Sequence, residues 1–269
     1  MSYPNDRKWF LYAEKLATKF LIHCKSLCLN AVDTFIEENS IEEKRLTEYM
    51  DIAGIFVNVR VQSDTYATLH HIFFDDVDWE IKRLRFDLWR LDSYIERYRQ
   101  KASEKEKAEI QLIISCIRNN SEFKILNENH KKVLMNRSES IDTIIVNWKF
   151  IPERLDTMNK KKVSWKEIFI KSGLNLSIFE NAHSFFSMYT HSNFFSTNHL
   201  YYLTKERSLT DKNFAILYSS FLITMILDDF ASKFTEAQNF IAQLSELDID
   251  IIKSFLHNGR EKEKIKYIK

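Results

Sequence analysis

Glycine and proline are scarce in this chain, with three glycines and two prolines among 269 residues. These residues are the usual punctuation of tight turns and short strands, so the chain has few positions suited to frequent reversals of direction. The scarcity predicts an all-α fold, an antiparallel helical bundle with long helices, made of one large domain plus a small insertion. We expect a single domain over 1–269, with its core bundle at about 41–101 and 164–234 and an insertion or linker at 121–163.

Charge and cysteine content exclude several classes of protein. The formal net charge is +1, so no global field would draw the chain to nucleic acid or to an anionic membrane. The longest apolar run, Phe214 to Leu227, has the length of a core helix, and the N-terminus has no apolar signal region. Three cysteines indicate reduced thiols, and no second Cys/His pair completes a zinc site. We therefore expect a cytoplasmic protein with no membrane association, no metal and no cofactor.

The stretch from Asn175 to Thr204 carries a single charged side chain, Glu180. Because an exposed helix needs a solvated face, this stretch predicts a buried helix, at about 176–195, around which the others pack. A helical wheel places Phe179 and Phe186 alongside four residues that share one apolar side: Ile178, Ala182, Phe185 and Tyr189. It places a narrow polar stripe opposite them: Glu180, Ser184, Ser187 and His191. We expect Phe185 and Tyr189 to be nearly fully buried and the stripe to line a polar cleft.

A first helix is expected at about Asp6–Glu38 and a second at about Ile41–Phe74. The second also carries a polar stripe, made of Arg60, Asp64, Ala67 and His71. Arg60 is either the charged edge of a surface helix or a buried guanidinium held by a carboxylate beside a site.

A third helix is expected at Trp79–Lys101. On it Arg85 could stack on the indole of Trp89 and pair with a carboxylate, although a solvated charged face is the commoner explanation of such a line. Further along, Gly173 should end a short helix that begins near Trp165, and an apolar helix should run from Asp211 to Phe234. The tail from Arg260 to Lys266 reads as a mixed-charge helix end or a frayed terminus.

Several of these positions together resemble uncharacterised bacterial helical proteins of the HEPN-like superfamily. The positions that carry the resemblance are Arg60-x-x-x-Asp64-x-Tyr66, Arg85-Phe86, Trp165-Lys-Glu-Ile, Gly173-Leu174 and Ser187-x-x-x-His191-Ser192. The resemblance implies a metal-independent ribonuclease or a nucleic-acid-acting effector of a bacterial defence or toxin system. The superfamily's signature is an arginine followed four to six residues later by a histidine on one helix. This chain departs from it, because no arginine precedes His183, His191 or His199 at that spacing.

Metal-free RNA cleavage needs an acid or base that titrates near neutral pH and a cation for the phosphorane. We predict that the two polar stripes face each other and bring together a catalytic set of His191, Arg60, Arg85 and Asp64. Residues expected to bind the substrate are Ser187, His71 and Tyr189. RNA or a nucleotide is the expected partner. The alternative is a non-catalytic helical module that binds a protein partner or a second copy of the chain, with His191 as a buried, hydrogen-bonded packing residue.

Overall fold

A computed structural model describes residues 5–32, 34–39, 44–49, 51–101, 103–136, 140–158, 163–176, 181–190, 196, 198, 199 and 205–268. The predicted all-α class is confirmed, since helices dominate and the strands in these residues form only two small two-stranded sheets. The chain divides into two compact units, Met1–His70 with Gly173–Lys269, and His71–Ser172. The predicted insertion at 121–163 lies wholly within the second unit, which begins earlier, at His71, and ends later, at Ser172.

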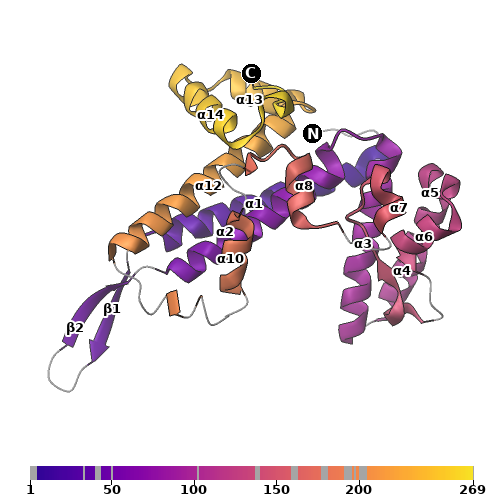
Figure 1. Cartoon of the computed structure of the whole chain (residues 1–269), viewed down its shortest axis with the longest axis horizontal. Coiled ribbons are helices and arrows are strands. Elements are labelled where there is room, and N and C mark those ends of the chain that lie inside the picture. The colour runs from indigo at the N-terminus through magenta and orange to yellow at the C-terminus, as the bar shows by residue number, and fades with distance from the viewer. Residues whose placement is uncertain are drawn as a thin grey trace. The chain divides into compact units, whose positions relative to one another are not determined.

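The first unit is built around helix α2, Ile52–Leu69, and Figure 1 shows α1, α10 and α12 alongside it. Asp51 caps α2 by accepting a hydrogen bond from the backbone N–H of Gly54 at 2.8 Å. Most of the helix is buried on several sides, and α1, α10 and α12 all pack on it. The first unit contains η1 Asn5–Phe10, α1 Leu11–Asn30, β1 Thr34–Asn39, β2 Lys44–Tyr49, α2, α10 Ala182–Thr190, α12 Lys205–Ala231, α13 Thr235–Ala242, α14 Glu246–Gly259 and η5 Lys262–Lys264.

A β-hairpin lies where the two predicted N-terminal helices were expected to meet. Strands β1 and β2 pair antiparallel, from Thr34 opposite Tyr49 to Asn39 opposite Lys44. The prediction that helices continue to Glu38 and restart at Ile41 was therefore wrong. The glutamates of this region suit a helix, but Thr34, Ile36 and Thr47 are β-branched and favour strands.

The face that helix α10 presents to the core is turned from the predicted one towards Phe186. Ala182, Phe186 and Tyr189 are buried, whereas Phe185 is only half-buried. Phe186 has no exposed surface, and its ring lies 5.3 Å from Phe56 on α2 and 5.4 Å from Tyr218 on α12, centroid to centroid. Burial of Tyr189 is confirmed and full burial of Phe185 is wrong. Ile178 of the predicted apolar side and His191 of the predicted polar stripe lie outside the described residues.

The C-terminal tail is packed, so the expectation of a frayed end was wrong. Arg260, Ile265 and Ile268 are all buried. The backbone N–H of Glu261 donates to the carbonyl of Gly173 at 2.8 Å. Gly173 ends the preceding helix, as predicted, with φ of 78°, and a Cβ at this position would lie 2.5 Å from Cβ of Lys264. Both the backbone conformation and the close approach of the tail therefore require glycine here.

The second unit packs α4, α5 and two short segments against α3. Helix α4 begins with a capping box between Ser103 and Glu106, in the segment that reads as a polar break in the sequence. The unit starts within η2 His70–Phe74, a π-helical turn, and continues with α3 Trp79–Lys101, α4 Glu104–Asn119, α5 Ser121–Ile125, α6 Glu128–Leu134, β3 Met135–Asn136, η3 Ile141–Thr143, β4 Ile145–Val146, η4 Pro152–Arg154, α7 Leu155–Met158 and α8 Trp165–Lys171.

Helix α12 is apolar enough over Glu206–Ala231 to meet the length and hydropathy of a membrane span. In the described part of the chain it is the one helix that does so, and 61% of its most apolar window is buried inside the protein. A core helix of a soluble protein meets the same criteria, so this finding is weak evidence for a membrane span.

Replacing Phe186 tests the observed orientation of α10. We expect Phe186→Ala to lower the free energy of unfolding by about 3–5 kcal/mol, because a fully buried ring leaves a cavity between α2 and α12. Phe185→Ala should cost clearly less, since its ring is half-buried. Urea denaturation measures both, with Phe240→Ala on the exposed face of α13 as a control expected to change stability by about 0.5 kcal/mol or less. A larger loss for Phe185→Ala than for Phe186→Ala would contradict this orientation.

Candidate functional site

Four polar side chains meet between α2 and α10. Arg60 and Asp64 lie one turn apart on α2, and His183 and Ser187 lie one turn apart on α10. Nε of Arg60 donates to Oγ of Ser187 at 2.6 Å, and Nη1 of Arg60 lies against Oδ1 of Asp64. Nε2 of His183 lies 3.1 Å from the same Oδ1. Because the earlier residue of one helix faces the later residue of the other, the two stripes meet in antiparallel register.

This group, Arg60, Asp64, His183 and Ser187, is called the α2/α10 cluster below. Its side chains are partly open: 13% of Arg60, 18% of His183 and 35% of Asp64 remain exposed. Solvent therefore screens its ion pairs, and each contributes little to stability. An arginine side chain that is still partly exposed beside an imidazole is instead suited to contacting an anion from outside.

The hydrogen bonds of the α2/α10 cluster determine which side chain could transfer a proton. Oγ of Ser187 donates to the carbonyl of His183 at 2.7 Å and accepts from Arg60, so its proton is already used and no base activates it. In the tautomer whose Nε2–H donates to Asp64, the lone pair of His183 is on Nδ1. The arrangement suits proton transfer by His183 and charge neutralisation by Arg60, with Ser187 and Asp64 orienting them.

The predicted catalytic set was Arg60, Asp64, Arg85 and His191, and the structure brings together its first two members. His191 lies outside the described residues. Arg85 belongs to the second unit, where its Nη1 donates to Asp75 and to the carbonyl of His71, both at 2.7 Å. The convergence of all four residues stays a prediction.

Arg85 is sealed inside the second unit. Its guanidinium lies 5.4 Å from the ring centroid of Phe150, so its aromatic neighbour is not the predicted Trp89. Its Nε and Nη2 have no hydrogen-bond partner among the described residues. Burial lowers the pKa of Arg85, and the attraction of Asp75 only partly opposes this.

The three predicted substrate-binding residues have different surroundings. Ser187 is in the α2/α10 cluster. His71 is buried in the second unit, with its ring centroid 6.1 Å from that of Trp148. The hydroxyl of Tyr189 lies 2.5 Å from Nδ1 of His199, and burial raises the pKa of Tyr189 to about 12. Tyr189 and His71 are therefore placed by core contacts.

His183 was not among the candidate site residues predicted from the sequence. A signal for it was present, because His183 and Ser187 repeat the four-residue spacing of Arg60 and Asp64. In the predicted wheel His183 lies beside the polar stripe of Glu180, Ser184, Ser187 and His191 and was not counted in it.

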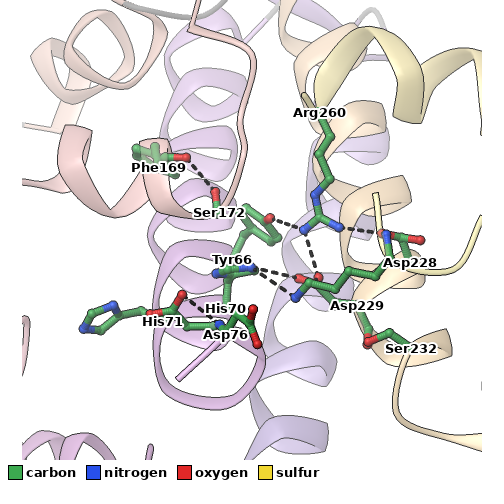
Figure 2. Close-up of polar contacts among 12 residues, drawn as sticks. Tyr66, His70, His71, Asp76, Phe169, Ser172, Asp228, Asp229, Ser232 and Arg260 are labelled. Carbon is green, nitrogen blue, oxygen red and sulfur yellow. Dashed lines mark hydrogen bonds and ion pairs between the residues drawn. The ribbon is translucent and has the colours of Figure 1, made fainter. Parts of the chain in front are cut away.

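A second polar cluster is fully buried at the C-terminal end of α12, and Figure 2 shows its contacts. The guanidinium of Arg260 donates to Asp228 at 2.6 Å, to Asp229 at 2.8 Å and to the hydroxyl of Tyr66 at 2.9 Å. All three charged side chains have no exposed surface. Burial alone would lower the pKa of Arg260, but Asp229, Tyr66 and Asp228 outweigh it and raise the pKa above its ordinary value.

Asp228 also holds the tail. Its carboxylate accepts the backbone N–H groups of Lys266, Tyr267 and Ile268 at 2.7–2.9 Å. A carboxylate with three backbone donors and a guanidinium has its acceptor sites used within the protein. This cluster therefore fixes the fold and is not the candidate site.

No group of three or more His, Cys, Asp or Glu side chains in the described part of the chain could hold a metal ion. Burial raises the pKa of Cys24 to about 11, so this thiol stays protonated near neutral pH. Comparisons with models of protein families, with curated proteins and with solved structures give no match to this chain. The resemblance to the HEPN-like superfamily stays a prediction.

Removing the buried guanidinium tests the structural role of the second cluster. We expect Arg260→Met to lower the free energy of unfolding by about 3–5 kcal/mol, because two buried carboxylates lose their main counter-charge. Arg207→Met is the matched control: Arg207 pairs with Asp211 but is 58% exposed, so the loss should be about 1 kcal/mol or less. Chemical denaturation of both variants measures the difference, and equal losses would contradict the assignment.

Proposed function

We propose that this protein is a metal-independent ribonuclease and that the α2/α10 cluster is its active site. The observation that carries the proposal is the meeting of a partly exposed histidine side chain and a partly exposed arginine side chain at one carboxylate, Asp64. Nδ1 of His183 removes the proton from a ribose 2′-hydroxyl, and the 2′-oxygen attacks the adjacent phosphorus. The bond to the 5′-oxygen breaks, and that oxygen takes a proton from water. Arg60 stabilises the charge on the phosphorane.

The roles within the cluster follow from its contacts. Asp64 orients the imidazole and holds Arg60 close to it, as a carboxylate does for many acid–base histidines. Ser187 fixes Nε of Arg60, which directs the Nη groups of the guanidinium. The proposal keeps the chemistry that the HEPN-like resemblance implies and gives the proton-transfer role to His183. In this proposal the enzyme uses no cofactor and acts as an effector of a bacterial defence or toxin system, the role that the resemblance implies.

Substituting His183 tests this function. We expect His183→Ala to lower the rate of RNA cleavage about 100-fold or more, the usual contribution of a general base, with cleavage by the wild type unaffected by EDTA. Arg60→Gln should reduce the rate to a similar extent because the phosphorane loses its cation. Gel analysis of a labelled single-stranded RNA measures these rates.

The control is His130→Ala, because His130 also pairs with a carboxylate, Asp156, at 2.7 Å, and lies in the second unit. It should leave cleavage unchanged. Thermal unfolding should show His183→Ala within about 1–2 kcal/mol of the wild type. A strongly destabilised variant together with a wild type that cleaves no RNA would mean that the α2/α10 cluster is only a packing contact.

A helical interaction module is the second candidate, and the exposed face of α12 favours it. Leu209, Ile216 and Ile223 recur every seven residues and are 38–41% exposed. A seven-residue apolar repeat matches the seam through which two helices pack as a coiled coil. A second copy of this chain presents the same repeat, so a homodimer is the simplest assembly that would cover it.

Charge substitutions on α12 separate this candidate from the first. If α12 pairs with a second copy, the wild type should sediment as a dimer and Ile216→Lys with Ile223→Lys as a monomer, because buried lysines without partners oppose association. The control is Leu112→Lys with Ile125→Lys, two exposed apolar residues of the second unit whose replacement should leave the dimer intact. A monomeric wild type at the highest concentration tested would rule out this assembly.

A further inference from the structure

A cationic pocket lies in the second unit, formed by α4, α5, α6 and β3. Its volume is about 450 Å³, within the usual range for small-molecule sites. Its lining residues are Arg118, Phe123, Lys124, Glu128, Lys131, Lys132, Met135 and Asn136. Four cationic side chains against one carboxylate leave an excess of three positive charges, in a chain whose formal net charge is only +1. We refer to this group of residues as the cationic pocket.

The charges of the cationic pocket are not balanced from within the described part of the chain. Arg118, Lys124 and Lys132 are exposed, and none of the three forms an ion pair with a described carboxylate. Lys131 does pair with Glu128 at 3.0 Å, but Glu128 is 79% exposed, so an incoming anion can displace it at low cost. Like charges gathered in one concavity repel each other, and a bound anion relieves that repulsion.

The rest of the lining indicates what the anion is attached to. Phe123 and Met135 are buried and form an apolar wall. The side-chain amide of Asn136 can both donate and accept a hydrogen bond. A second pocket of the same unit, about 240 Å³, is lined by Asp92 and Lys149 and shows no such excess of positive charge. The combination of several cations, an apolar wall and one amide suits a phosphate joined to a heteroaromatic base.

We propose that the cationic pocket binds the phosphate and base of a nucleotide, either free or as one unit of an RNA strand. Arg118, Lys124 and Lys132 hold the phosphate, and the base lies against the apolar wall with Asn136 at its polar edge. This inference does not rest on the proposed ribonuclease activity, because the pocket shares no residue with the α2/α10 cluster.

Calorimetric titration of the full chain tests this site, with ATP, AMP, inorganic phosphate and a short single-stranded RNA as separate probes. We expect a nucleotide or the RNA to bind at one site per chain and Lys124→Gln with Lys132→Gln to weaken that binding about tenfold or more, because two charge-assisted contacts are lost. Higher salt should weaken binding to the wild type more than to this variant. Both lysines are exposed, and thermal unfolding should confirm that the variant stays folded.

The matched control is Lys19→Gln with Lys105→Gln, which removes the same charge from exposed positions outside the cationic pocket and should bind like the wild type. His183→Ala should also bind like the wild type, so a failure of the ribonuclease proposal leaves this result unaffected. Binding of ATP or AMP identifies a free nucleotide, and binding of RNA alone identifies a strand. Three results would overturn the proposal. Inorganic phosphate could bind as tightly as the other probes, no probe could bind, or the two double variants could bind with equal affinity.

Discussion

The first unit depends on the buried guanidinium of Arg260. Three fully buried charged side chains are unfavourable unless their geometry satisfies them, and here Arg260 meets Asp228, Asp229 and Tyr66 at 2.6–2.9 Å. The contacts join the end of α12, the residue after α14 and the last turn of the buried helix α2. Since Asp228 also accepts three backbone N–H groups of the tail, the last residues of the chain are held against α12 by the same carboxylate. Tyr66 lies two residues beyond Asp64, so the network that holds Tyr66 also limits how α2 can turn beneath α10.

Local patterns in the sequence were sufficient for the helical class and for several helix ends. Scarce glycine and proline predicted long helices, and the stop at Gly173 was correct because a positive φ is a local property of glycine. The hairpin of β1 and β2 was not predictable by the same reasoning, because its strands are stabilised by pairing with each other and its glutamates suit a helix in isolation. The buried tail was missed for a related reason. Arg260 reads as part of a solvated charged end until it is known that Asp228, 32 residues earlier, lies beside it.

The candidate site was predictable to the extent that it depends on spacing within one helix. Arg60 and Asp64 were identified because they lie one turn apart among apolar neighbours, and Ser187 because it stands in a stretch that lacks lysine and arginine. His183 was missed because the spacing fixes which residues share a face but not which face meets α2. That choice is made by packing: both Phe185 and Phe186 contact Phe56, but only Phe186 of the two is fully buried, with Tyr218 on its other side. His183 therefore joins the candidate residues, and the role of His191 stays a prediction.

Arg60, Arg85 and Arg260 show why a buried or paired arginine is not by itself a sign of function. Arg260 is paired with two aspartates and a tyrosine, so a ligand could reach it only by breaking contacts that hold the fold. Arg85 is equally enclosed, and a substrate would have to enter the core of the second unit to meet it. Arg60 is different because one partner is a hydroxyl and the other a carboxylate with a third of its surface in water. Exchanging a partly solvated partner for a phosphate costs little free energy, whereas uncovering a sealed ion pair costs several kcal/mol. Of these three arginines, Arg60 is therefore the one that a ligand can reach at the lowest cost in free energy. His183 lies beside it, so these two residues form the candidate pair for acting on a ligand.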